Sequence, residues 1–184
     1  MTSLLLSLAA GGTASVSSAA AAQLPQGKVL VAYFSRSGNT RTVAGQVRRA
    51  LQADLFQIEP ETPYPDDYFE TVEQAQQETE SGYEPPLKGT VADIGSYGTV
   101  FLGFPIWGTT APPVIRSFLS AHDLSGKTLI PFVTHGGYGL GSSLEVVARH
   151  APDARLVEGF TMDAPQERQT IEQVTEWLDG LEAR

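Results

Sequence analysis

The chain of 184 residues contains no cysteine. Disulfide bonds, iron–sulfur clusters, thiolate metal sites and a cysteine nucleophile are therefore excluded. Basic residues are also scarce, 12 against 21 acidic ones, and the net charge of −9 disfavours nucleic acid as a partner. The length suits one domain, and a hydrophobic fraction of 41% is enough for an ordinary core.

Charge is absent altogether from residues 1–27. The apolar run at residues 4–10 and the Gly, Ser and Ala residues after it resemble an export signal with a small-residue cleavage site. The run is too short to span a bilayer, so we expect no integral membrane segment in the mature chain. Because no Lys or Arg precedes the run, a disordered Ala/Ser-rich arm is the alternative. We expect an exported protein (periplasmic or extracytoplasmic), with a cytoplasmic one as the alternative, and a folded domain over residues 28–184.

Beyond residue 27, apolar runs that suit buried strands alternate with apolar residues at helical spacing. This alternation predicts an α/β fold: a doubly wound, five-stranded parallel sheet in the order 2-1-3-4-5, with helices on both faces. The fourth strand contains Pro131, which cannot donate a ladder hydrogen bond, so we expect a local bulge there. The predicted elements are strands at residues 29–34, 55–58, 100–104, 128–133 and from 156, and helices at residues 43–51, 68–80 (capped by Asp66 or Asp67), 112–119, 144–148 and 171–181.

Acidic side chains concentrate between Asp54 and Asp93, where eleven acids accompany a single base, Lys88. A segment of this kind is either a solvated face or a docking surface for a partner with basic patches. The sequence leaves both interpretations open.

The loop after the first strand combines hydroxyls, an amide and a glycine just before a helix. Backbone N–H groups at a helix N-terminus suit a phosphate group, and Gly38 lets the backbone approach closely. A plain helix cap, for which one such residue would be enough, is the alternative. The loop matches neither the Walker A nor the dinucleotide pattern, so a mononucleotide fits better than ATP or NAD. Its candidate ligand residues are Ser35, Arg36, Ser37, Gly38, Asn39 and Thr40.

Two further loops follow the third and fourth strands and reach the same end of the sheet, where ligands bind in such folds. The first carries Trp107 beside a glycine, which suits stacking on a flat aromatic ligand; packing against the next helix is the alternative. The second has four glycines within six residues, which lets backbone amides approach a ligand, and Tyr138 offers a second ring. The candidate residues are Pro105, Ile106, Trp107, Gly108 and Thr109 in one loop, and Thr134, His135, Gly136, Gly137 and Tyr138 in the other.

We assign no catalytic residue and expect no metal site. His135 lies in the third loop, but it has no partner at metal-ligand spacing, which favours a structural role over a catalytic one. The other two histidines, His122 and His150, are expected at the surface. Ser142 and Ser143 lack the pentapeptide of a serine hydrolase.

Together the three loops resemble the flavodoxin family. Residues 33–40 look like its phosphate-binding loop, residues 103–108 like its first flavin loop, and residues 134–137 like the second flavin loop of a bacterial subgroup. In that subgroup a Tyr-Pro-x-x-Tyr stretch follows the second strand, and residues 64–68 are similar to it. The resemblance runs from about residue 28 to the C-terminus. It implies a flavodoxin-like fold and non-covalently bound FMN, with the flavin ring near Trp107 and Tyr138.

The resemblance implies an electron carrier, and the acidic charge of the chain favours a redox partner protein with a basic surface. An NAD(P)H-dependent FMN or quinone reductase on the same fold is the main alternative, and a binding module that has lost its flavin is a third. Rings covering both faces of the flavin would favour the carrier, and one bare face would favour the enzyme. The sequence departs from well-known flavodoxins at Thr109 and Thr110, where an acidic residue is common.

Overall fold

Six strands pair in parallel to form one sheet in the computed structural model, which describes residues 27–164. Their order is β2-β1-β3-β4-β5, and β6 also pairs with β4. The predicted order 2-1-3-4-5 is therefore confirmed, with the fifth strand split in two. The strands are β1 (Lys28–Tyr33), β2 (Asp54–Gln57), β3 (Tyr97–Pro105), β4 (Thr128–His135), β5 (Arg155–Leu156) and β6 (Phe160–Asp163).

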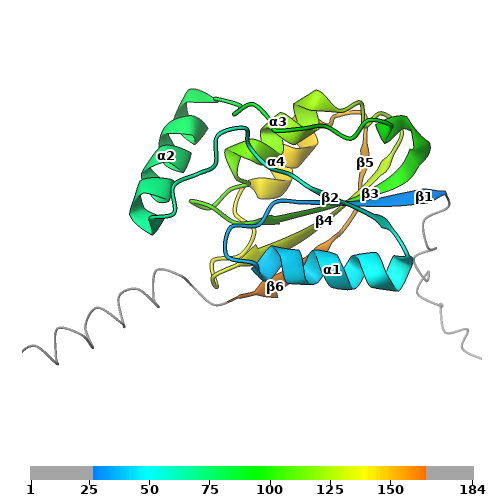
Figure 1. Ribbon diagram of the computed structural model, residues 1–184, viewed down its shortest axis with the longest axis horizontal. Helices are drawn as coiled ribbons and strands as arrows, with labels where there is room; N and C mark the ends of the chain where they lie inside the picture. The colour runs from blue at the N-terminus through cyan, green and yellow to red at the C-terminus, as the bar shows by residue number, and fades with distance from the viewer. Residues whose placement is uncertain (1–26, 165–184) are drawn as a thin grey trace, which may run out of the picture.

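Helices lie on both faces of the sheet, as expected: α1 covers one face, and α3 and α4 cover the other (Figure 1). Within residues 27–164, none of the helices combines the length and the apolar character needed to cross a bilayer. The helix predicted over residues 171–181 and the segment 1–26 lie outside the described residues. The described helices are α1 (Asn39–Leu51), α2 (Tyr68–Ser81), α3 (Pro113–Ala121), α4 (Ser143–His150) and one 3-10 turn (Ile94–Ser96).

The central strands are buried on both sides because helices cover both faces. Leu30, Leu102 and Phe104 are at most 1% exposed and belong to the core on the side of α3 and α4. Val31 and Phe132 point the other way and pack into a smaller core with α1. This packing fixes the carboxyl ends of β1, β3 and β4, from which the three candidate loops emerge.

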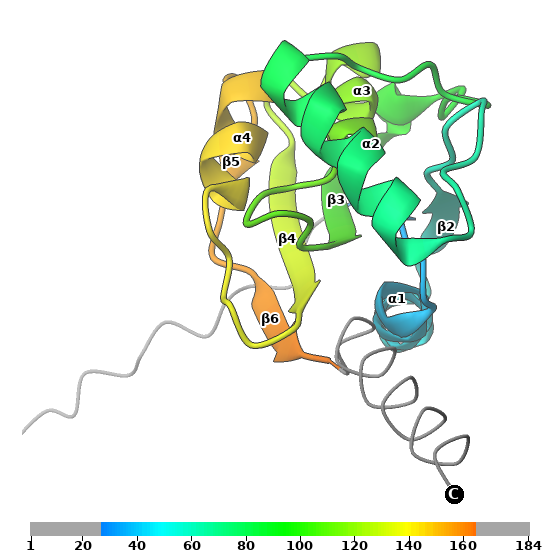
Figure 2. The ribbon, with the colours of Figure 1, turned by 90° about the vertical axis from the view of Figure 1, so that its left-hand side faces the viewer.

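The helix α2 does not cover a face of the sheet. It stands beyond the carboxyl ends of the strands, beside the three candidate loops (Figures 1 and 2). Asp67 caps it as predicted, because its carboxylate accepts hydrogen bonds from the backbone N–H groups of Phe69 and Glu70. The sequence predicted this helix and its cap but not its position.

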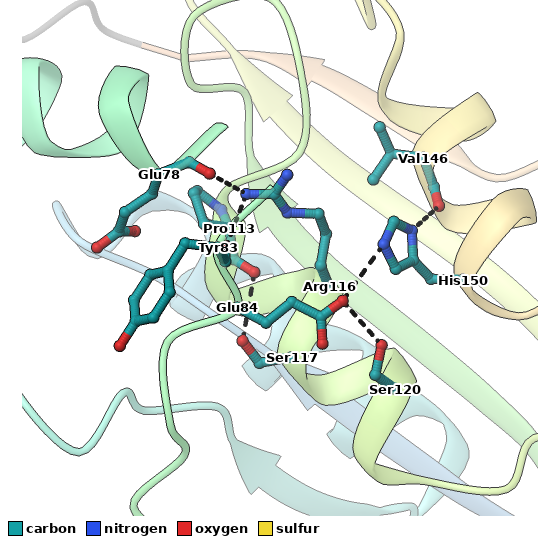
Figure 3. A network of polar contacts seen from close by, with 9 residues as sticks. All are labelled: Glu78, Tyr83, Glu84, Pro113, Arg116, Ser117, Ser120, Val146 and His150. Carbon is teal, nitrogen blue, oxygen red and sulfur yellow. Dashed lines mark hydrogen bonds and ion pairs between the residues drawn. The ribbon is translucent and has the colours of Figure 1, made fainter. Parts of the chain in front are cut away.

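The C-terminal end of α2 is held by the buried Arg116 of α3 (Figure 3). Its Nη2 donates to the backbone carbonyls of Glu78, 2.9 Å away, and Tyr83, 3.0 Å away. Nearby, the carboxylate of Glu84 accepts a hydrogen bond from Ser120 at 3.0 Å and lies 3.5 Å from Nε2 of His150. These contacts attach α2 and the segment after it to α3 and α4.

The irregularity expected at Pro131 lies in the neighbouring edge strand. The ladder between β3 and β4 runs through Pro131 without a shift of register. On the other side, Leu129 pairs with Leu156 and Phe132 pairs with Phe160, so the edge chain uses one residue more than β4 between these pairs. Since proline offers no N–H to the ladder, pairing breaks there and divides the edge strand into β5 and β6.

The surface position expected for His122 is wrong, because this side chain is buried at the end of α3. Its Nδ1 donates to the carbonyl of Phe118 at 2.7 Å, and its Nε2 accepts the backbone N–H of Val91 at 2.9 Å. Burial lowers the pKa of His122 below the ordinary histidine value. His150 turns back in the same way to the carbonyl of Val146 and is half-buried.

Candidate cofactor site

A cavity of about 690 Å³ lies between α2 and the loops at the carboxyl ends of β1, β3 and β4. Figure 2 looks onto this end of the sheet, with α2 in front. The structure thus brings the three predicted loops together around one space. Of the predicted cofactor residues, those that line it are Arg36, Ser37, Asn39, Pro105, Ile106, Trp107, Gly108, Thr109, Thr134, His135, Gly136 and Tyr138, whereas Ser35, Gly38, Thr40 and Gly137 do not.

The first loop leaves the N-terminus of α1 ready to receive an anion. Gly38 is the N-cap residue, with a φ of 96°, and no side chain caps the helix there. The first turn of α1 contains no acidic residue. Ser35 shapes the loop, because its hydroxyl accepts the N–H of Gly38 at 3.2 Å. The N–H groups that no side chain caps, together with the helix dipole, therefore favour a phosphate beside Ser37 and Asn39.

Thr40 joins two loops and does not line the cavity. Its hydroxyl lies 2.9 Å from the hydroxyl of Thr134, and Thr40 is only 1% exposed. This buried hydrogen bond ties the start of α1 to the end of β4, which holds the first and third loops in fixed relation.

Arg36 connects the first loop to the segment before α2. Its Nη2 donates to the backbone carbonyl of Asp66, and its guanidinium lies 5.9 Å from the centre of the Tyr68 ring. The side chain also lines the cavity, so it places a positive charge at the end where α1 begins.

The second loop is a tight hairpin. The backbone groups of Trp107 and Thr110 exchange two hydrogen bonds, of 2.9 and 3.0 Å. The two residues between them, Gly108 and Thr109, have φ values of 54° and 70°. Two successive positive φ values are those of a type I′ turn. This conformation is easy for glycine but strained for a β-branched threonine.

The indole of Trp107 is fixed by two other aromatic rings. It meets Phe34 edge-on with 5.1 Å between ring centres and Tyr64 edge-on at 4.9 Å. The side chain is half-buried, and part of it lines the cavity. Both interpretations of Trp107 therefore hold in part: it packs against aromatic residues, and it also presents surface to a ligand.

Tyr64 is anchored by a buried carboxylate that sequence reasoning missed. Its hydroxyl donates to Glu78 of α2 at 2.8 Å, and Gln74 donates to the other carboxylate oxygen at 2.8 Å. Glu78 is only 8% exposed. Burial, together with the hydrogen bond to Glu78 and its charge, raises the pKa of Tyr64 far above the ordinary value. No sequence spacing links the two residues, since Tyr64 precedes the helix that carries Glu78.

Backbone hydrogen bonds connect the second and third loops. The N–H of Ile106 donates to the carbonyl of Thr134 at 2.9 Å, and the N–H of Ser142 donates to the carbonyl of Thr109 at 3.0 Å. A Cβ at Gly141 would lie 1.8 Å from that same carbonyl oxygen. Gly141 is thus required by the neighbouring loop rather than by a ligand.

His135 has a structural role in the third loop. Its Nδ1 accepts the N–H of Gly137 at 3.1 Å, and its carbonyl accepts the N–H of Ala164. Tyr138, in contrast, is 77% exposed and lines the cavity, so its ring is available to a ligand.

A smaller cavity of about 440 Å³ lies on the other side of the first loop. Its walls include Glu59, Glu61 and Lys88, and Glu59 lies 3.5 Å from Lys88. Carboxylates repel a phosphate, so the larger cavity is the better phosphate site.

Comparisons with known proteins agree with this geometry. The sequence profile of the flavodoxin family matches residues 28–181. The solved structure of a candidate flavoprotein from Bacteroides eggerthii is 35% identical, with a TM-score of 0.69, over 83% of this chain and 96% of that one. A second candidate flavoprotein, from Bacteroides uniformis, is 30% identical, with a TM-score of 0.69, over 82% and 98%.

A flavoprotein from Lactobacillus acidophilus, solved in complex with FMN, is similar in fold, with 19% identity and a TM-score of 0.67 over 73% of this chain and 93% of that one. No curated protein sequence matches the chain.

Proposed function

The chain belongs to the flavodoxin family, and we propose that it binds FMN non-covalently in the larger cavity and passes electrons through it to and from other proteins. The observation that carries this proposal is the convergence of three loops on one cavity. One end of the cavity offers a helix N-terminus for a phosphate, and the other offers Trp107 and Tyr138 for a flat ring system.

In this proposal the first loop binds the phosphate, and the second and third loops bind the flavin ring. Ser37, Asn39 and the first N–H groups of α1 hold the phosphate, with Arg36 adding positive charge. Residues 105–109 of the second loop border the ring, together with Thr134, His135, Gly136 and Tyr138 of the third. Four predicted residues do not line the cavity, and we assign them the role of maintaining the loop conformation: Ser35, Gly38, Thr40 and Gly137.

Bound FMN supplies the redox chemistry, and the protein sets its position and electrostatic surroundings. Phe34 and Tyr64 hold Trp107 in one orientation, so the ring pocket needs little rearrangement on binding. The acidic segment around α2 suits a redox partner with a basic surface.

A reductase that uses NAD(P)H directly is the second candidate. Such an enzyme needs space for a second ligand, and the cavity is open beside the exposed ring of Tyr138, with α2 as a wall. Oxidation of NADH and NADPH by the FMN-loaded protein, with and without a quinone, distinguishes the two. If the protein is an electron carrier, we expect it to oxidise NADH and NADPH no faster than free FMN does at the same concentration. Rapid, saturable NAD(P)H oxidation would identify a reductase instead.

We also propose export, on the basis of the uncharged segment 1–27. Fractionation of the native host with an antibody against the domain tests this proposal. A shortened chain outside the cytoplasm is expected, and a full-length cytoplasmic chain would contradict it.

A further inference from the structure

The smaller cavity, of about 440 Å³, has no role in the proposed binding of FMN. It lies between the first loop and the segment that joins β2 to α2. Arg36 and Ser37 line both cavities, so a single layer of residues separates them. The volume is within the range of sites that bind small molecules.

The outer wall of this cavity is fixed by backbone pairing. The N–H of Glu61 donates to the carbonyl of Pro86 at 2.7 Å, and the N–H of Lys88 donates to the carbonyl of Glu59 at 2.9 Å. The wall is therefore in place before a ligand arrives, which lowers the entropy cost of binding.

Part of the lining is apolar. Two of its rings, Phe34 and Tyr64, are the ones that meet Trp107 edge-on, so they are already held in place by their neighbours. The apolar lining residues are Phe34, Ile58, Pro60, Pro63, Tyr64 and Pro65. A ligand with an apolar body can cover these side chains and gain from their burial.

The charged part of the lining has carboxylates to spare. Lys88 is paired with Glu59 at 3.5 Å, and Arg36 donates to the backbone carbonyl of Asp66. The carboxylates of Glu61 and Asp66 also line the cavity, and within residues 27–164 neither makes a hydrogen bond or an ion pair. Two such carboxylates beside an apolar wall are complementary to a cation with an apolar body.

We propose that the smaller cavity binds a small organic cation, a primary amine in its ammonium form with a short apolar body. The carboxylates of Glu61 and Asp66 attract the ammonium group, and the body lies against Phe34, Tyr64 and the prolines. The site is separate from the larger cavity, so this inference goes beyond the proposed function and does not depend on it.

The test compares three probes of similar size that differ in charge: phenethylamine, 2-phenylethanol and phenylacetate. Their binding to the FMN-loaded protein is measured by calorimetry at low and at high salt. We expect phenethylamine to bind one-to-one, more tightly than 2-phenylethanol and more weakly at high salt, and phenylacetate not to bind. If the chain takes up no FMN, the proposed function fails, but the same titration of the FMN-free protein still tests this site.

Two matched double variants locate the site. Glu61→Gln with Asp66→Asn should weaken phenethylamine binding by about tenfold, because two exposed ion pairs are lost. Glu70→Gln with Glu73→Gln is the control, since it removes the same charge from α2 outside the lining of this cavity. Equal losses from the two double variants, binding of phenylacetate as tight as that of phenethylamine, or no binding of phenethylamine would overturn the inference.

Discussion

Gly141 shows how one residue can decide the shape of the site. Its φ of 52° is unfavourable for any other residue, and a Cβ there would meet the carbonyl of Thr109. Gly139, two residues earlier, has a φ of 73°, but a Cβ added to it would meet nothing within 4 Å. At both positions a side chain would strain the backbone, but only at Gly141 would its Cβ also meet a neighbouring atom.

This contrast gives a prediction at the scale of the residue. Gly139→Ala should cost about 1–2 kcal/mol of stability through backbone strain alone. Gly141→Ala should cost roughly twice as much and should also weaken FMN binding, because it separates the second and third loops. Denaturant unfolding of the FMN-free variants measures the stability. Equal losses would show that Thr109 does not press against Gly141.

At the scale of the element, Tyr64 and Glu78 hold α2 in its unusual position. Tyr64→Phe removes the hydroxyl and leaves a buried carboxylate with one hydrogen bond fewer, so we expect a loss of about 1–3 kcal/mol. Tyr97→Phe is the control, since Tyr97 also donates to a carboxylate at 2.8 Å, that of Asp54, but in an exposed pair. This control should lose less than about 1 kcal/mol.

Denaturant unfolding compares the two tyrosine variants, and the fluorescence of Trp107 reports whether its ring keeps its place beside residue 64. A loss from Tyr97→Phe as large as that from Tyr64→Phe would contradict the role given to Glu78.

His122 makes the attachment of α3 sensitive to acid. Its Nε2 accepts the N–H of Val91, so protonation of that nitrogen breaks the hydrogen bond. Burial lowers the pKa in the folded state, so the unfolded chain binds a proton more readily. Stability from this group is complete well above about pH 6.5 and is lost as the pH falls from there toward the lowered pKa.

We therefore expect the free energy of unfolding to decrease below about pH 6.5, by up to ~1.4 kcal/mol for each unit by which the pKa is lowered. Unfolding of the wild type and of His122→Gln at a series of pH values measures this. The variant should be less stable near neutrality, with a flatter profile. If the free energy of unfolding changes with pH in the same way for both proteins, the pKa of His122 is the same in the folded and unfolded states.

At the scale of the whole molecule, the net charge of −9 acts on the bound flavin. Full reduction adds negative charge to a chain that is already negative, so the second electron should enter at a lower potential than in free FMN. Salt screens exposed charges, and the Debye length falls from ~10 Å at 0.1 M to ~3 Å at 1 M. Potentiometric titration at these two salt concentrations should show a modest rise of that potential. A potential unmoved by salt would indicate that the acidic side chains are only a solvated face.

Much of the fold could be predicted because it depends on local patterns. Apolar runs and helical spacing marked the strands and helices, and their alternation gave the order of the sheet. The position of α2 could not be predicted, because its direction depends on contacts such as those of Arg116, which no periodicity records. His122 was misjudged for a related reason, since the loop that covers it comes from residues far away in the sequence.

The candidate site shows the same division. Ser37, Trp107 and Tyr138 were identified from unusual residues at strand ends, and the structure brings them to one cavity. The sequence places Thr40 among the candidate ligand residues, yet its hydroxyl serves a contact between loops, as does the close approach at Gly141. Such a role emerges only when the distance between loops is known.

The most direct test of the central claim is an equilibrium titration of the FMN-free protein with FMN and with riboflavin, which lacks the phosphate. If the N-terminus of α1 holds the phosphate in this cavity, FMN binds one-to-one and at least roughly tenfold more tightly, because hydrogen bonds to a charged group contribute about 1.5–3 kcal/mol each. Equal affinities for FMN and riboflavin would contradict the account.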